Sequence, residues 1–292
     1  MRKRWLVNFI LLLLVAGIAT LLYLRPKPEV KTEKTYALSS KKLSDFSKLS
    51  IEFPTKAPVV FEKKNGLWRM VKPYDARANQ SSVQRILSII AATSKEKFPV
   101  DNRAQFGLDK PALKVKLDDQ EIDFGTYNPV SSDQYVAYKD AIYMVSSTYS
   151  EAASIQPLEL IDKAILKPGE KPVAFDLSHL EQWEDIRLHV DLENGKWKIS
   201  TPKAQPSQDK MNQWLDIYWN HAEAKSVEPY TPDHKTTYPS LDITMQDGSK
   251  VHLDKIQESP ELLLGRPDEG MLYHFAPDFG FTMLNPPIGL IK

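Results

Sequence analysis

The sequence predicts an α+β protein with an N-terminal transmembrane helix followed by two tandem repeats, each a curved antiparallel sheet with one packed helix. Three observations lead to this prediction. The chain opens with a long apolar run, the remainder contains strand-like alternation around Asn-Gly turns, and similar patterns recur about 130 positions apart. The internal similarity is the most informative of the three, because a repeated module determines the architecture of the whole chain.

The apolar run from Trp5 to Leu24 contains 20 residues and few polar side chains. At ~1.5 Å per residue, a helix of this length spans the hydrocarbon core of a bilayer, about 30 Å. Three basic residues, 2–4, precede the run and favour a cytoplasmic N-terminus. We therefore expect a single-pass anchor in a bacterial inner membrane, with the body in the periplasm. A cleaved signal peptide is the alternative, although the run is longer than a usual signal core.

Composition narrows the class of protein further. The chain has no Cys, which excludes disulfides, thiolate metal sites and thiol nucleophiles. The formal net charge is zero, but the first 27 residues are basic without acidic residues, so the rest is mildly acidic. A body without a basic cluster argues against nucleic-acid binding.

The repeat is visible as matching residue types in the same order. Asn65-Gly66, Trp68 and Pro73 recur 129 positions later as Asn194-Gly195, Trp197 and Pro202. Leu113, Val115 and Leu117 recur 128 positions later as Leu241, Ile243 and Met245. The alternating Leu49, Ile51 and Phe53 match Ile186, Leu188 and Val190. These matches predict a first repeat at 43–166, a linker at 167–172 and a second repeat at 173–292. The segment 25–42 before them is predicted to be an extended polar stalk, because prolines and charged residues keep it extended and solvated.

Each repeat is expected to begin with strands and to continue with a helix. The Asn-Gly pairs predict hairpins, because both residues tolerate positive φ. Asn79 and Ser207 are candidate N-caps of the two helices. In the first helix, Val83, Ile86, Leu87 and Ile90 form an apolar stripe.

Short strands are expected to fill the second half of each repeat. In the first repeat they are 113–117, 122–124, 135–138 and 142–145. In the second they are 241–245, 250–253, 261–264, 272–275 and 281–284. A connecting helical segment is expected at 150–166.

Two motifs give a resemblance to a known family. The strand end from Trp68 to Pro73 and the segment Phe106-Gly107-Leu108-Asp109-Lys110-Pro111 resemble the domain of unknown function 4340 family, over most of residues 44–220. The resemblance implies a bitopic envelope protein, that is, one that crosses the membrane once. Some members of the family accompany ABC-type exporters or components of gliding machinery. It implies no catalytic residues.

Motifs for chemistry are missing from the sequence. The six His form no H-E-x-x-H pair, no G-x-S-x-G elbow occurs, and no glycine-rich nucleotide loop is present. We therefore expect no catalytic residues, no metal site and no cofactor. A hydrolase whose groups meet only in space stays an alternative.

Aromatic and apolar residues give the candidate partner contacts, because Trp and Tyr are favoured at recognition surfaces. The candidates are Trp219, Tyr135, Tyr138, Phe106 and Leu108. Core packing is the competing interpretation, and for Trp219 the two interpretations are about equally supported.

The expected function is that of a membrane-anchored periplasmic binding or scaffold protein, an accessory subunit of an envelope transport or assembly complex. Its partners are the inner membrane, through Trp5–Leu24, and a membrane protein such as an ABC-type transporter. The alternative is an envelope hydrolase, or a lipid- or glycan-binding protein with its site in the groove between the repeats. The sequence does not indicate an oligomeric state.

Overall fold

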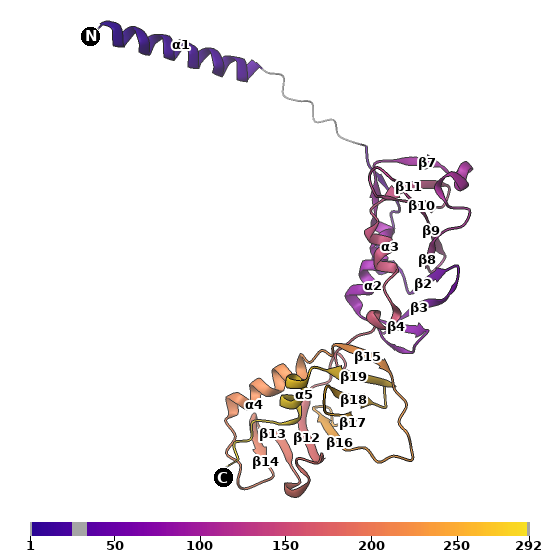
Figure 1. Ribbon diagram of the computed structural model, residues 1–292, viewed down its shortest axis with the longest axis vertical. Helices are drawn as coiled ribbons and strands as arrows, with labels where there is room; N and C mark the ends of the chain where they lie inside the picture. The colour runs from indigo at the N-terminus through magenta and orange to yellow at the C-terminus, as the bar shows by residue number, and fades with distance from the viewer. Residues whose placement is uncertain (1, 25–33, 291–292) are drawn as a thin grey trace. The chain divides into compact units, whose positions relative to one another are not determined.

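The computed structural model describes residues 2–24 and 34–290 (Figure 1). The chain divides into two units, one ending at Thr35 and the other beginning at Tyr36. In the first unit, α1 (Arg2–Leu24) is helical over the N-terminal apolar run. No helix in the part of the chain that the structure describes is long and apolar enough to cross a membrane. Residues 25–33 of the predicted stalk lie outside the described residues.

The first sheet of the second unit is antiparallel throughout, with the strand order β5-β4-β3-β2-β8-β9-β10-β11-β7. Its strands are β2 (Lys48–Phe53), β3 (Lys56–Lys64), β4 (Leu67–Lys72), β5 (Ala76–Arg77), β7 (Lys97–Pro99), β8 (Leu113–Leu117), β9 (Gln120–Tyr127), β10 (Gln134–Tyr138) and β11 (Ala141–Val145). A separate pair, β1 (Tyr36–Ala37) with β6 (Thr93–Ser94), joins the start of the unit to this sheet.

Local sequence explains the first sheet. Leu49 and Ile51 are buried while Ser50 between them is partly exposed, as period-two alternation requires. Asn65 and Gly66 both have positive φ in the turn between β3 and β4. The helix α2 (Gln80–Leu87) begins at Asn79, whose side chain accepts a hydrogen bond from the Ser82 amide at 3.0 Å.

The second sheet has the order β14-β13-β12-β16-β17-β18-β19-β15, again antiparallel. Its strands are β12 (Pro172–His179), β13 (His189–Glu193), β14 (Lys196–Ile199), β15 (Ser226–Pro229), β16 (Ser240–Met245), β17 (Lys250–Gln257), β18 (Leu262–Arg266) and β19 (Met271–Phe275). Apart from the additional β5, the order of the second sheet matches that of the first, strand by strand.

Helices cover one face of each sheet (Figure 1). In the first, α2 packs beside α3 (Thr148–Ala153); in the second, α4 (Gln208–Leu215) and α5 (Pro277–Leu284) take these places. One hydrophobic cluster runs through both sheets and includes Phe61 and Phe275.

Three sequence predictions need correction. Phe281–Leu284, predicted as a strand, belongs to α5, because Pro277 at the first turn favours a helix start. Each sheet carries two α-helices among the described residues, where one was expected. Ile186 and Leu188 do not correspond to Leu49 and Ile51. The position of β2 in the first sheet is occupied by β12 in the second, whereas Ile186 lies in a short 3₁₀ turn (Glu184–Ile186) before β13. Alternation alone does not distinguish neighbouring strands.

Candidate functional site

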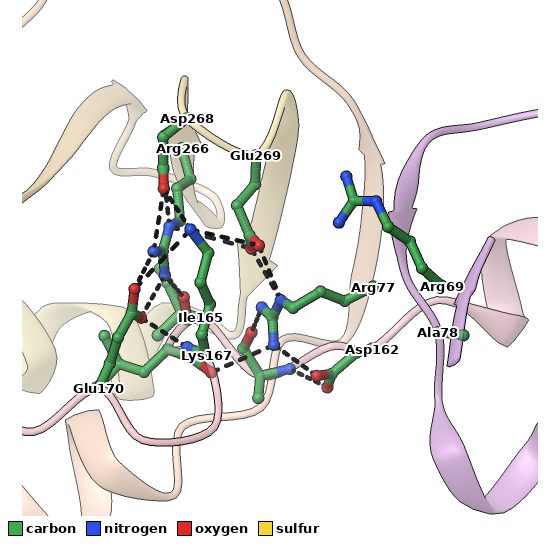
Figure 2. A network of polar contacts seen from close by, with 12 residues as sticks. Arg69, Arg77, Ala78, Asp162, Ile165, Lys167, Glu170, Arg266, Asp268 and Glu269 are labelled. Atoms are coloured by element: carbon green, nitrogen blue, oxygen red, sulfur yellow. Dashed lines mark hydrogen bonds and ion pairs between the residues drawn. The ribbon is translucent and has the colours of Figure 1, made fainter. Parts of the chain in front are cut away.

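A network of charged side chains joins the two sheets (Figure 2). It combines Arg77 of β5, the segment 162–170 that leads from the first sheet to the second, and the turn between β18 and β19. The charged members are Arg77, Asp162, Lys167, Glu170, Arg266, Asp268 and Glu269. Three cations therefore meet four carboxylates.

Arg266 is the centre of one half of the network and is fully buried. Its guanidinium donates to both carboxylate oxygens of Glu170, at 2.6 and 2.9 Å, and to Asp268 Oδ1 at 2.9 Å. It also donates to the backbone carbonyl of Ile165. Burial by itself acts to lower the pKa of Arg266, but the hydrogen bonds to Glu170 and Asp268 outweigh burial and raise the pKa above its ordinary value.

Arg77 is the centre of the other half and reaches from the first sheet to the second. Its Nε lies 3.0 Å from each carboxylate oxygen of Glu269, and its Nη2 donates to Tyr273 Oη at 3.1 Å. The same guanidinium bonds Asp162 and the carbonyls of Ala164 and Leu166. Burial acts to lower the pKa of Arg77, but the neighbouring acidic groups, Glu269 above all, outweigh burial and raise the pKa above its ordinary value.

Lys167 and Tyr273 complete the contacts. Lys167 Nζ lies 2.6 Å from Asp268 and 3.9 Å from Glu269. Burial acts to raise the pKa of Asp268, yet Arg266 and Lys167 hold it below its usual range. Tyr273 donates to Glu269 at 2.9 Å, and burial together with the Glu269 charge raises the pKa of this phenol. Every charge in the network is thus paired.

Such a network makes the contact between the sheets specific. Removing one partner of a buried ion pair leaves an uncompensated charge and typically costs 3–5 kcal/mol, whereas the intact pair adds little net stability. The network therefore disfavours any arrangement of the sheets that separates Arg77 from Glu269. We refer to these charged residues and Tyr273 as the joint.

A cavity of about 630 Å³ lies beside the joint. Its walls come from the linker segment Leu166–Val173 and from the second sheet and its helix, including Leu192, Leu215, Asn220 and Gln246. Asp162, Lys167 and Glu170 also line it, but the joint already engages their side chains. Among the described residues, no group of three or more His, Asp or Glu side chains is arranged to hold a metal ion.

The five predicted contact residues do not form one site. Trp219 is fully buried, packed against Phe175 and Trp214 with ring centroids 5.0 and 6.1 Å away. Tyr138 is buried too, and its hydroxyl donates to Gln120 at 2.6 Å.

The other three predicted residues do come together. Phe106 and Leu108 are buried in a small satellite cluster against half-buried Tyr135, with the Phe106 and Tyr135 rings 4.7 Å apart. Gly107, at φ +69°, allows the turn between them. Binding of a partner at these positions stays a prediction.

Sequence reasoning did not find the joint, because its members are scattered from Arg77 to Tyr273. One signal was present. Leu262, Leu264 and Arg266 are spaced by two, so they share one face of β18, and two of the three are apolar. A charge at an inward-facing strand position indicates a buried ion pair.

Comparison with known proteins agrees with the resemblance seen in the sequence. The family model for "Domain of unknown function (DUF4340)" matches residues 68–268, more than half of the chain. The chain belongs to this family. No match is found among curated proteins or among solved structures.

Proposed function

We propose that this chain is a non-enzymatic scaffold protein of the bacterial envelope, anchored in the inner membrane, which serves as an accessory subunit of a transport or assembly complex. The observation that carries the proposal is the joint. Arg266 is fully buried and Arg77 pairs with Glu269 across the two sheets, so both sheets are presented as one body of fixed geometry. Fixed geometry favours binding, because less freedom is lost on association.

The outer faces of the sheets, opposite the helices, are suited to binding. A hollow of about 420 Å³ lies over β2, β3 and β8, with Lys48, Glu52 and Glu62 among its lining residues. A second, of about 500 Å³, lies over the ends of β12, β16 and β17. The first combines charged residues with Pro58, Val60 and Val71, and the second is lined mainly by polar residues, as are the rims of protein interfaces.

Anchoring is proposed on the basis of the N-terminal run. Trp5–Leu24 is a run of 20 residues, most of them apolar, and it lies within α1. The described large apolar side chains of α1, such as Leu12 and Leu14, are more than half exposed and so are available to lipid. The basic residues before the run favour a cytoplasmic N-terminus and a periplasmic body.

Duplication of one module is also proposed. The matching strand order supports it, as does an unusual contact in each half. Gln80 bonds both the amide and the carbonyl of Trp68, and Gln208 does the same for Trp197. In both halves the glutamine is the first residue of the helix that follows the strand.

In-cell crosslinking of the full-length protein, followed by purification in detergent and mass spectrometry, tests the proposal. We expect a membrane protein, such as a subunit of an ABC-type transporter, to recur with the wild type and to diminish with Arg266→Ala. Arg69→Ala is the matched control, because within the described part of the chain Arg69 forms an ion pair with Asp75 alone, near the surface. Recovery of the protein without any recurring partner would contradict the scaffold function.

A second candidate is ligand binding in the cavity beside the joint, which Leu192, Leu215 and Val173 line with apolar surface. A lipid chain fits such a lining better than a hydrolase substrate does, because the carboxylates of the cavity, Asp162 and Glu170, are already paired with arginines. Mass spectrometry of lipids in the same preparation separates the two candidates: an enriched lipid lost in Leu215→Arg favours ligand binding.

A further inference from the structure

The outer face of the second sheet carries a cleft of about 500 Å³, and several of the side chains that line it make no hydrogen bond within the described residues. It lies where β12 ends and β16 begins, between the segments 178–184 and 237–240. Asp242 and His252 line the cleft together with hydroxyl-bearing residues. These are Ser178, Thr237, Tyr238 and Ser240.

His252 holds Asp242 in a fixed position. Its Nδ1 lies 2.7 Å from Asp242 Oδ1, and its Nε2 lies 3.1 Å from Asp254 Oδ1. A neutral imidazole has a single N–H, so both carboxylates receive a hydrogen bond only from the imidazolium. Asp254 is buried and also accepts from the Tyr230 hydroxyl at 2.8 Å. When it is protonated, the imidazole therefore bridges a buried carboxylate and one that borders the cleft.

Several groups in the cleft have hydrogen-bonding capacity to spare. The second oxygen of Asp242 has no bonded partner among the described residues, and the same holds for the hydroxyls of Thr237, Tyr238 and Ser240. Glu184 at the rim is likewise exposed and unpaired within the described part of the chain. Hydroxyls both donate and accept, whereas carboxylates only accept.

This mixture selects among ligand classes. An anion would approach Asp242 and Glu184 against their charge. A metal ion would need three converging ligands, and no such group is found in the described residues. A neutral polyhydroxylated molecule fits, because each of its hydroxyls donates to a carboxylate or accepts from a side-chain hydroxyl. The half-buried Tyr238 adds an aromatic ring on which the C–H face of a sugar packs.

We propose that this cleft binds a neutral oligosaccharide, with Asp242, Ser240 and Tyr238 in contact with the sugar and His252 as the positioning residue for Asp242. The site does not depend on the scaffold function, since it lies within one sheet. It also differs in place from the cavity beside the joint.

Saturation-transfer NMR on the full-length protein tests this proposal, in a zwitterionic detergent that carries no sugar. The probes are chitotetraose, cellotetraose and maltotetraose, each at up to about 10 mM, where even a millimolar Kd is detected. We expect at least one tetrasaccharide to bind. Asp242→Asn is expected to weaken binding about tenfold or more, and Ser240→Ala about fivefold. The effect at Asp242 is larger because a hydrogen bond to a charged carboxylate contributes more than one to a neutral hydroxyl.

Controls separate the site from general effects. Asp119→Asn removes an exposed acid of the first sheet and is expected to leave binding unchanged. His252→Gln keeps a single donor, so it is expected to weaken binding. We expect the wild type to lose affinity as rising pH deprotonates His252, and we expect His252→Gln to lack this pH dependence. Thermal unfolding by circular dichroism verifies that each variant is folded.

The outcomes decide the proposal. It is overturned if none of the three tetrasaccharides binds the wild type. It is also overturned if Asp242→Asn and Ser240→Ala both bind the sugar as tightly as the wild type does. It is also overturned if spermidine binds in a manner that depends on Asp242 while the sugars do not, since the cleft is then a site for organic cations.

Discussion

Residues that lie directly opposite one another on adjacent strands form rows across each sheet, and corresponding rows of the two sheets carry different charges. In the first sheet, Glu52, Lys114 and Asp123 face one another across β2, β8 and β9, so charges alternate in sign. The second sheet places Asp176, Asp242 and His252 in the same row of β12, β16 and β17. There two aspartates are neighbours, an unfavourable pairing that His252 relieves from one side. The outer faces therefore differ although the strand order agrees.

The inner faces and the edges, by contrast, are built alike. Gln80 Oε1 accepts from the Trp68 amide at 2.9 Å, and Gln208 Oε1 accepts from the Trp197 amide at 2.7 Å. Each glutamine thereby supplies hydrogen bonds to both the N–H and the C=O of its tryptophan. The comparison teaches that inward residues and edge contacts specify the fold, while the outer faces are free to carry function.

The largest expected effect comes from the joint, which holds the two sheets together. Arg266→Ala leaves Glu170 and Asp268 without their buried partner, so we expect a loss of about 3–5 kcal/mol in the free energy of unfolding. Urea denaturation monitored by circular dichroism measures it. Arg69→Ala, which removes an ion pair with a largely exposed Asp75, is expected to cost less than about 1 kcal/mol. Equal losses in the two variants would contradict the role of the joint.

Glycine substitutions sharpen the comparison of the two sheets. A Cβ on Gly125 would lie 2.1 Å from the backbone oxygen of Phe106, whereas one on Gly265 would lie 2.4 Å from the ring of Tyr230. Overpacking costs about 1–3 kcal/mol, and a backbone atom yields less than a side chain. Gly125→Ala should therefore destabilise more than Gly265→Ala in the same denaturation assay. The reverse order would refute this account of the two contacts.

The edge glutamines give a smaller effect. Gln80 makes three backbone hydrogen bonds, two to Trp68 and one to the carbonyl of Ala78, whereas Gln208 makes two to Trp197. At about 0.5–1.5 kcal/mol for each bond, Gln80→Ala should destabilise somewhat more than Gln208→Ala. Hydrogen exchange at the two Trp amides measures the local effect. Unchanged protection of both amides would show that the glutamines do not support the strands.

The smallest effect is a pH dependence that only the second sheet should show. Burial acts to lower the pKa of His252, but Asp242 and Asp254 outweigh it and raise the pKa above its ordinary value. The resulting stability is complete below the unfolded value of about 6.5 and is lost as pH rises through the folded pKa.

His252 is about half exposed, so the expected change in melting temperature is small. Thermal melts of the wild type and His252→Gln between about pH 6 and pH 9 test it. The difference between the two proteins should shrink as pH rises. A difference that grows with pH would have the wrong sign for this mechanism.

Local signals in the sequence were sufficient for much of the fold. Leu113–Leu117 is a strand with the predicted bounds, the Asn-Gly pairs form hairpin turns, and Asn79 caps α2. Each depends on neighbours in the chain, so local pattern determines it. The family assignment rested on equally local motifs and is confirmed by the match over residues 68–268.

Features that depend on distant residues were not predictable in the same way. The short strands β7 and β15 lack alternation and exist because β11 and β19 offer them edges. Trp219 gave no clear signal of burial, since it lies in a π-helical turn (Asp216–Asn220) that shifts it relative to the stripe of α4. The joint and the His252 cleft each combine segments far apart in the chain.

The central claim is that the joint holds the two sheets as one body, and distances between spin labels test it most directly. The chain has no Cys, so Asp140→Cys and Lys250→Cys introduce one unique label site on each sheet. Pulsed electron resonance on the full-length protein should give a single narrow distance distribution, which Arg69→Ala preserves and Arg266→Ala broadens. A broad distribution in the wild type, or a narrow one that survives Arg266→Ala, would contradict the claim.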